Sequence, residues 1–256
     1  MILNSSQPER RTSWPSFLLL ASLVVATCLL GGCATSTSNF SSGTYHVDAY
    51  APTAPGDVQV LVSLNAKMVY VMEGDRPLMI TPTSIGTPEY PTPTGHFTVT
   101  AKDPTKRSGE YGFWVNGNDI RSGSAGSPPG AGYSYVGYPM ANWVEFAPGF
   151  GFHEGYVWPI PRSHGCLRLH KNASVKFFKL VGIGTPVTIA RSLPEDDTIG
   201  RNVIHPTDYL DPDPPASFMI SPEYFTQPRD SDLLPQATTA APAQTSTPPT
   251  AIPPQT

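Results

Sequence analysis

The chain has 256 residues, of which 30 are proline and only 14% are charged, and its formal net charge is −4. This composition is typical of one compact domain with poorly structured flanks. The negative charge offers no basic face, so we expect no nucleic-acid partner. The sequence has neither a Walker-type phosphate loop nor a Rossmann glycine fingerprint, which excludes the common nucleotide-binding classes.

Residues 1–32 are predicted to be a secretory signal peptide. Arg10 and Arg11 supply its positive start. Its apolar run, residues 17–30, is shorter than the roughly 20 residues that a membrane-spanning helix needs. The run ends in Leu30-Gly31-Gly32-Cys33, which resembles the lipobox of bacterial lipoproteins. The resemblance implies that Cys33 is lipidated and anchors the protein to a membrane of the bacterial envelope, facing the periplasm. An uncleaved anchor or an ordinary cleavage site is the alternative.

Residues 33–56 are rich in Ser, Thr, Gly, Ala and Pro, which predicts a flexible tether. The composition changes at Val58, where apolar and polar residues begin to alternate with the period of a β-strand. Tight turns separate this stretch from further short apolar runs. The pattern predicts an antiparallel β core, with strands at 58–64, 68–72, 78–83 and 96–101.

Residues 103–140 are rich in Gly, Ser, Pro and Tyr, and their hydrophobic residues are too sparse for long elements. Such a stretch in a compact domain is usually a functional loop or lid, so we expect an irregular segment here. Short strands are predicted to follow at 143–146 and 151–153.

A short helix is predicted at residues 173–181. Asn172 is its expected N-cap, and Lys176 is expected to face solvent. A strand at 185–189 then closes a domain that we delimit to residues 57–191.

The sequence after this domain becomes acidic and then rich in Pro, Thr and Gln. Residues 192–235 keep scattered large hydrophobic side chains, which predicts an extension packed partly on the domain. Residues 236–256 have almost none, which predicts a disordered tail.

The three cysteines differ in their locations. Cys28 lies within the predicted signal peptide and Cys33 at its end, so Cys166 is the single cysteine of the domain. It has no disulfide partner there, and the spacing of the three does not match a zinc site. Arginines lie on both sides of Cys166, and positive charge lowers the pKa of a thiol. From the residues alone, Cys166 fits a catalytic thiol and a small buried hydrophobe equally well.

Three motifs in the middle of the chain resemble those of one enzyme family. They are Tyr90-Pro91-Thr92-Pro93-Thr94-Gly95-His96-Phe97, Ser163-His164-Gly165-Cys166-Leu167-Arg168-Leu169 and Gly184-Thr185-Pro186-Val187-Thr188-Ile189. With His153 upstream, they resemble the L,D-transpeptidase catalytic domain, the YkuD-like family of bacterial cell-wall enzymes. The resemblance covers roughly the whole predicted domain. It implies a mainly β fold, a sandwich or barrel of short mixed strands with one short helix after the catalytic motif.

The resemblance also implies roles for the site residues. Cys166 is expected to be the nucleophile that forms a thioester, and His153 the general base. His164 is the rival base, although in the family it is more often a supporting residue. Ser163 is expected to orient His153 through its hydroxyl or carbonyl. The N–H groups of Gly165 and Cys166 are expected to bind the oxyanion.

Two further residues bear on the substrate and on the base. Arg168 is expected to hold a substrate carboxylate bidentately, with a structural salt bridge as the alternative. Many members of the family have glycine directly after the upstream histidine, whereas Glu154 stands before Gly155 here. This departure leaves open whether His153 or His164 is the base.

The resemblance implies a peptidoglycan L,D-transpeptidase. Such an enzyme takes a tetrapeptide stem, releases D-alanine and passes the acyl group to an amine on a second stem or a protein. It needs no metal or organic cofactor, although His153, His164 and Cys166 could also form a metal site. Two alternatives remain open, which are an L,D-carboxypeptidase that hydrolyses the same intermediate and a lipoprotein that binds peptidoglycan without turnover.

Overall fold

The computed structural model describes residues 45–236. The predicted signal peptide, Cys33 and residues 237–256 of the predicted tail lie outside the described residues. Within residues 45–236, no helix is long and apolar enough to cross a membrane.

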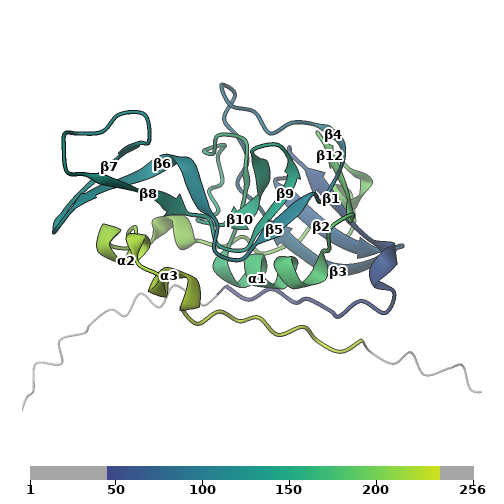
Figure 1. Cartoon of the computed structure of the whole chain (residues 1–256). Helices are drawn as coiled ribbons and strands as arrows, with labels where there is room; N and C mark the ends of the chain where they lie inside the picture. Colours follow the sequence, from purple (N-terminus) through teal and green to yellow (C-terminus); the bar gives the residue numbers. More distant parts are fainter. Residues whose placement is uncertain (1–44, 237–256) are drawn as a thin grey trace, which may run out of the picture. The chain divides into compact units, whose positions relative to one another are not determined.

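Two mixed β-sheets make up the body of the domain (Figure 1). The first has the order β3 (Arg76–Pro82), β2 (Met68–Glu73), β1 (Val58–Ser63), β12 (Pro186–Ala190) and β4 (Gly95–Thr98). The second has the order β11 (Leu167–Leu169), β10 (Phe150–Glu154), β9 (Trp143–Ala147) and β5 (Ala101–Asp103). The strands β1, β2 and β3 pair antiparallel as predicted, but β12 runs parallel to β1 and β11 runs parallel to β10. The prediction of a mainly β fold with mixed strands is therefore confirmed.

The main apolar core contains residues from both sheets and from helix α1 (Lys171–Leu180). Val60 and Val62, on alternating positions of β1, are fully buried in it. Phe152 of β10 meets Phe177 of α1 with 4.5 Å between their ring centroids. Burying a side chain of this size stabilises the fold by roughly 1.5–3 kcal/mol. This core fixes β10 and β11, the two strands between which the Ser163–Cys166 motif lies.

A third sheet occupies most of the segment that was predicted to be irregular, residues 103–140. Its order is β7 (Asp119–Ser124), β6 (Arg107–Asn116) and β8 (Ser134–Pro139). Phe113 of β6 packs with Met219 of α2 (Ala216–Ile220) and Tyr224 of α3 (Glu223–Thr226). The prediction was wrong because a sheet buried on one face needs few aliphatic residues. The elements that cover that face come from the distant C-terminal extension.

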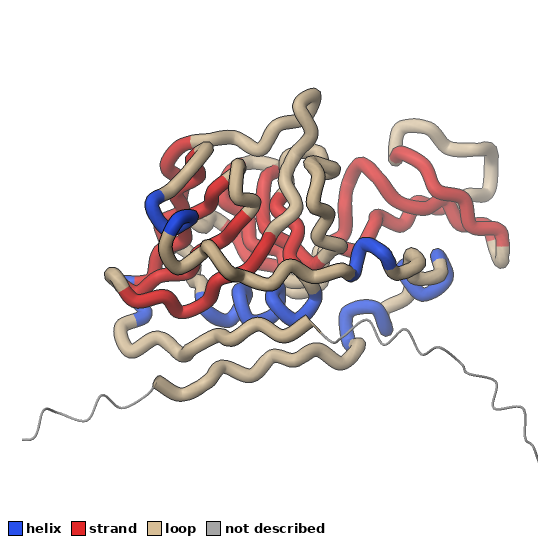
Figure 2. Tube along the Cα trace, turned by 180° about the vertical axis from the view of Figure 1, so that it is seen from behind, coloured by secondary structure: helices blue, strands red, loops and turns tan. Residues whose placement is uncertain are grey.

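The C-terminal extension winds around the domain. It includes the 3-10 turns η2 (Pro194–Asp197) and η3 (Asp208–Leu210), and η1 (Pro55–Asp57) precedes β1. Leu193 and Val203 pack on the outer face of β2, where the Tyr70 hydroxyl donates to Asp196 over 2.8 Å. Residues 227–236 then run below α1, beside residues 45–51 (Figures 1 and 2). The extension thus contacts the helix and all three sheets, since its Arg229 also pairs with Glu154 of β10.

The described part of the predicted tether, residues 45–56, is not a free linker. Val47 and Ala49 are buried in the main core, and Ala49 forms a β-bridge with Met79 of β3. The tether prediction is wrong here because these small apolar residues lie between β3 and the C-terminal extension, which the composition of this segment does not reveal.

Helix α1 is the single α-helix of residues 57–191, as predicted, but two details differ. Its N-cap is His170, whose Nδ1 accepts a hydrogen bond from the Asn172 N–H over 3.2 Å. Lys176, expected in solvent, is only 2% exposed. Its Nζ donates to Val47 O and forms an ion pair with Asp230, both at 2.8 Å. Both partners belong to the flanking segments, which is why the helical pattern alone misplaced this lysine.

Candidate active site

Residues 163–166 form a tight turn directly before β11. The Ser163 hydroxyl accepts a hydrogen bond from the Gly165 N–H (3.1 Å) and donates one to Cys166 O (2.6 Å). Gly165 has a φ of +102°, and a Cβ at this position would lie 2.5 Å from the Phe150 ring. Only glycine fits both constraints. The turn places Cys166 directly before the first residue of β11.

The loop before β4 holds this turn from the other side. The Thr92 hydroxyl donates to Gly165 O (2.9 Å) and accepts from the Gly86 N–H (3.0 Å). The Thr87 N–H donates to Ser163 O (3.0 Å). The Thr-Pro-Thr-Gly stretch therefore supports the catalytic motif. The sequence indicated Thr92 only as part of the family motif, and this hydrogen-bonding role was not predicted. A hydroxyl side chain among Pro and Gly residues was nevertheless a sign that it could bond to the backbone.

His153 lies on β10, where its backbone is in register with Arg168 of the parallel strand β11. Its side chain is buried, and Nδ1 is 2.7 Å from Glu154 O. A carbonyl oxygen can only accept, so Nδ1 carries the hydrogen and Nε2 keeps a free lone pair. Burial, together with the positive charge of Arg168, lowers the pKa of His153 to about 3. The imidazole is therefore neutral and has the tautomer of a general base.

The carbonyl of Glu154, rather than Ser163, orients His153. The Ser163 hydroxyl is committed to Gly165 and Cys166, and its carbonyl to Thr87. The predicted orienting role of Ser163 is therefore wrong. A backbone carbonyl is present at every residue, so the sequence carried no signal for this contact.

The Cys166 thiol is half-buried, with Sγ 3.7 Å from Gly149 O. Burial raises the pKa of the thiol, and the Gly151 N–H and the Arg168 charge oppose this rise only in part. The thiol is therefore protonated at neutral pH. The thiol and the imidazole are both neutral at rest, and transfer of a proton from Sγ to Nε2 would generate a reactive thiolate.

Of the two N–H groups expected to bind an oxyanion, those of Gly165 and Cys166, only the N–H of Cys166 is available. The Gly165 N–H is already bonded to the Ser163 hydroxyl, so Gly165 shapes the turn and does not face the reaction. The Cys166 N–H makes no hydrogen bond to any residue in the described range and is free to stabilise an oxyanion.

Cys166, His153 and Arg168 line one cavity of about 650 Å³. The third sheet forms one wall of the cavity with Ser108, Gly109, Glu110, Tyr111 and Tyr138, and the body of the domain forms another with Trp143 and Glu145. The volume lies in the range of small-molecule sites, which is roughly 300–1,000 Å³. Basic and acidic groups are both present in the cavity, since Lys106 and Arg168 lie in the same lining as Glu110 and Glu145.

A family model described as YkuD, the L,D-transpeptidase catalytic domain, matches residues 57–189, which is more than half of the chain. The chain belongs to this family. Its membership, predicted from three motifs, is thereby confirmed.

Several solved L,D-transpeptidase structures are similar to this chain. The protein from Mycobacterium smegmatis is 21% identical, with a TM-score of 0.40 over 52% of this chain and 58% of that one. The protein from Stackebrandtia nassauensis is 19% identical, with a TM-score of 0.39 over 57% and 60%. L,D-transpeptidase 1 of Mycobacterium tuberculosis is 23% identical, with a TM-score of 0.37 over 52% and 59%. The match thus spans less than two thirds of each of these chains. A comparison with curated protein sequences gave no match.

Arg168 is one of two cationic side chains, with Lys106, that line the cavity. Its guanidinium forms neither an ion pair nor a hydrogen bond with residues 45–236, so the salt-bridge alternative is wrong. Burial lowers the pKa of Arg168, yet an arginine stays charged at any pH that proteins tolerate. A half-buried guanidinium that faces a cavity, with no partner among residues 45–236, favours a carboxylate ligand.

His164 of this L,D-transpeptidase domain contacts two tyrosines. Its exposed ring stacks on Tyr111 (centroids 4.8 Å apart, planes 24° apart) and makes a tilted contact with Tyr90 (4.5 Å, 52°). It is a supporting aromatic residue at the rim of the cavity, and the geometry favours His153 as the base. Within residues 45–236, no group of His, Cys, Asp and Glu is arranged to hold a metal ion, so His153, His164 and Cys166 do not form such a site.

Proposed function

We propose that this chain is a peptidoglycan L,D-transpeptidase in which Cys166 is the nucleophile and His153 the general base. One observation carries the proposal. A single cavity holds a free thiol, a neutral imidazole with a fixed tautomer and an unpartnered guanidinium. Family membership supports acyl transfer in general, and these three groups supply the chemistry of a cysteine acyltransferase.

In the proposed first step, Sγ of Cys166 attacks the amide carbonyl that precedes the terminal D-alanine of a tetrapeptide stem. The thiol proton passes to Nε2 of His153 as the S–C bond forms. The free N–H of Cys166 stabilises the oxyanion of the tetrahedral intermediate. The C–N bond then breaks, the amine of D-alanine leaves with the proton from Nε2, and a thioester remains.

In the second step, the amine of an acceptor attacks the thioester. His153 takes a proton from this amine and returns it to Sγ, so the enzyme ends in its starting state. With water in place of the amine, the same steps describe an L,D-carboxypeptidase. The two activities differ in the acceptor alone, so the products distinguish them.

Arg168 supplies recognition in this proposal. Peptidoglycan stems carry carboxylates close to the scissile amide, and a guanidinium binds a carboxylate with two parallel hydrogen bonds. Arg168 follows Cys166 by two positions and lines the same cavity. A stem carboxylate held there would bring the amide carbonyl to the thiol. Replacement by lysine would keep the charge but lose the two-pronged geometry.

The decisive experiment is mass spectrometry after incubation with a carbapenem, an acyl donor that cannot complete the cycle. We expect a covalent adduct on the wild-type protein and none on Cys166→Ala. We expect slow adduct formation in His153→Ala and near-normal formation in His164→Ala, because His164 lies outside the catalytic pair. If the wild type forms no adduct and does not process stem peptides, the enzymatic proposal is wrong. Shortened stems without cross-linked dimers would instead identify a carboxypeptidase.

We also propose that the mature protein is a lipoprotein of the bacterial envelope, anchored through Cys33. The support is the Leu-Gly-Gly-Cys sequence at the end of the apolar run. Such an anchor would keep the domain beside its polymeric substrate. Metabolic labelling with palmitate should mark the wild type and not Cys33→Ala. Equal labelling of both would contradict the anchor.

A further inference from the structure

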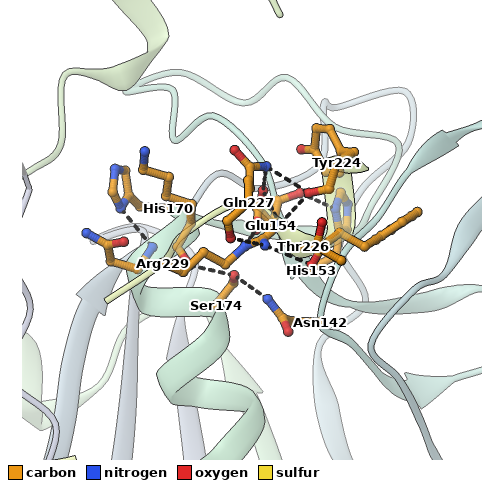
Figure 3. A network of polar contacts seen from close by, with 12 residues as sticks. Asn142, His153, Glu154, His170, Ser174, Tyr224, Thr226, Gln227 and Arg229 are labelled. Carbon is orange, nitrogen blue, oxygen red and sulfur yellow. Dashed lines mark hydrogen bonds and ion pairs between the residues drawn. The ribbon is translucent and has the colours of Figure 1, made fainter. Parts of the chain in front are cut away.

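The C-terminal extension reaches the catalytic base through one buried side chain, that of Glu154. Successive side chains on a strand point to opposite faces, so His153 faces the cavity while Glu154 faces the extension (Figure 3). Both side chains are buried. The carbonyl oxygen of Glu154 is also the acceptor that holds Nδ1 of His153. Glu154 therefore joins the base to whatever binds its carboxylate.

Arg229 binds that carboxylate with both prongs of its guanidinium. Its Nε donates to Oε2 over 2.6 Å and Nη2 donates to Oε1 over 3.2 Å, while Gln227 adds a weaker contact to Oε1 at 3.4 Å. The side chains of Arg229 and Glu154 are only 7% and 5% exposed. A buried ion pair of this kind is strongly disturbed when one partner is removed.

The remaining donors of Arg229 hold the end of α3. They bond to the carbonyls of Tyr224 (3.0 Å), Phe225 (3.1 Å) and Gln227 (3.0 Å). All five N–H groups of the guanidinium are thus used, which is the full capacity of an arginine. The side chain is fixed in one position, and so is the carboxylate that it holds.

The backbone N–H groups of Glu154 and Gly155 are anchored on the side of the sheet that contains β10. The Glu154 N–H donates to Ala141 O and the Gly155 N–H donates to Leu169 O, both over 2.9 Å. The carbonyl that His153 uses belongs to the Glu154–Gly155 peptide, whose N–H is the one bonded to Leu169 O. The ion pair with Arg229 is the anchor on the opposite side, and it comes entirely from the C-terminal extension.

From this arrangement we propose that Arg229 is a positioning residue for the base. Through the carboxylate of Glu154 it fixes the peptide carbonyl that orients His153, so the C-terminal extension completes the active site. The inference rests on the proposed function, since it assigns Arg229 a role in the reaction of Cys166 and His153.

The extension has other anchors, and this allows the positioning role to be separated from simple attachment. Asp230 pairs with Lys176 and donates its N–H to Asn172, and Leu234 bonds to the backbone of the segment at residues 49–51. None of these contacts involves Glu154. Asp230→Asn weakens the attachment next to Arg229 without touching the link to the base, so it is the matched control.

The test compares Arg229→Ala, Arg229→Lys and Asp230→Asn by single-turnover acylation with a carbapenem, at a temperature where circular dichroism shows every variant folded. We expect acylation to slow about tenfold or more in Arg229→Ala. Arg229→Lys, which keeps the charge without the fork, should be intermediate. The acylation rate of Asp230→Asn should stay within about twofold of the wild-type rate, even if its melting temperature falls as far as that of Arg229→Ala. In a Glu154→Gln background, Arg229→Ala should add less than about twofold.

The pH profile supplies a readout that a purely structural role would not move. The charged or titratable groups around His153 include Arg168 and the Cys166 thiol in the cavity, and the Glu154–Arg229 pair with Tyr224 on the side of the extension. Lys106, Tyr138 and Glu145 line the same cavity. Loosening the peptide admits water, so in Arg229→Ala the acidic limb of acylation should move up toward pH 6.5, the ordinary pKa of histidine. Equal rates and pH profiles in Arg229→Ala and Asp230→Asn would overturn the inference.

A spectroscopic measurement keeps this inference separate from the proposed function. In wild type and Asp230→Asn, the Nδ1–H of His153 should give a downfield proton resonance that exchanges slowly with water, whether or not the protein is an enzyme. Arg229→Ala should broaden or lose this resonance. If the wild type forms no carbapenem adduct, the proposed function fails and the resonance still decides the inference. If Arg229→Ala keeps the resonance unchanged, the positioning role is refuted.

Discussion

Replacing Thr92 by valine tests whether the loop before β4 holds the catalytic turn. Valine has nearly the shape of threonine and removes only the hydroxyl. That hydroxyl donates to Gly165 O over 2.9 Å and accepts from the Gly86 N–H over 3.0 Å. Thr92 is buried, so both partners would be left without a hydrogen bond inside the protein.

The packing around Gly86 determines the size of the effect. Gly86 is closely packed, since a Cβ there would lie 2.2 Å from Tyr90 O and 2.9 Å from the Cα of Gly165. The added methyl group of valine would occupy the place of the hydroxyl and leave no room for a water molecule. A buried polar group left unpaired costs about 1–3 kcal/mol. For one donor and one acceptor we expect Thr92→Val to lose about 2–4 kcal/mol of unfolding free energy. With a typical dependence on urea, the midpoint falls by about 1–2 M.

The assay is urea unfolding followed by circular dichroism, combined with the rate of carbapenem acylation. We expect acylation to slow by about tenfold, because Gly165 O would leave its position and move the Cys166 peptide. Thr94→Val is the matched control, since Thr94 is exposed in the same loop and should change stability by less than about 0.5 kcal/mol. If both variants unfold at the same urea concentration, the hydroxyl of Thr92 does not hold the turn.

Three further predictions concern the turn and the histidines. Gly165→Ala should destabilise the domain by about 2 kcal/mol or more and abolish acylation, because φ of Gly165 is +102° and the Phe150 ring blocks a Cβ. An unchanged midpoint of thermal unfolding would contradict this prediction. The wild-type acylation rate should vary less than about twofold between pH 5 and 8, since burial lowers the pKa of His153 to about 3 and raises the pKa of Cys166. A fall of the stopped-flow rate below about pH 6.5 would disprove this prediction. Unfolding free energy should fall by about 2 kcal/mol from pH 7 to pH 5. Below pH 6.5 the unfolded chain takes up protons on His153 and His170, whereas burial lowers the pKa of these histidines in the folded state to about 3 and about 4. Asp208, whose pKa burial raises to about 6, offsets part of this loss of stability. Urea titrations at the two pH values check it, and equal stability would show that the histidines are not buried as neutral groups.

The parts of the fold that the sequence predicted are those whose burial depends on near neighbours. Alternation along residues 58–63 predicted β1 because Val58, Val60 and Val62 all face one core. The third sheet could not be predicted in the same way. Its buried face meets α2 and α3, and neither covering helix leaves a pattern within residues 103–140.

Lys176 illustrates the same limit within a correctly predicted helix. Its position was assigned to solvent because lysine is almost never fully buried unless it is paired. The pair exists, but its partners are Val47 O and Asp230, which come from segments at opposite ends of the domain. Local periodicity cannot report a contact whose partners lie so far away along the chain.

In the candidate site, the side chains that meet in the cavity were predictable from the motif, and the contacts that support them were not. Cys166, His153 and Arg168 were named from the sequence, and all three line one cavity. The orienting acceptor is a backbone carbonyl, that of Glu154, which no residue type announces. The Ser163 hydroxyl, expected to reach His153, instead completes hydrogen bonds within its own turn. Polar side chains near a catalytic group commonly satisfy the backbone first, because an unpaired buried peptide group is costly.

Under the proposed function, the charge of Arg168 links substrate recognition to the activation of the thiol. In the free protein it lowers the pKa of both His153 and Cys166, so it favours the thiolate but opposes the imidazolium that must form with it. Under the proposed function, a stem carboxylate bound to Arg168 neutralises that opposition and raises the proton affinity of His153. The base then becomes effective only when a donor occupies the cavity. In its absence the thiol stays protonated, which limits its reaction with other electrophiles and oxidants.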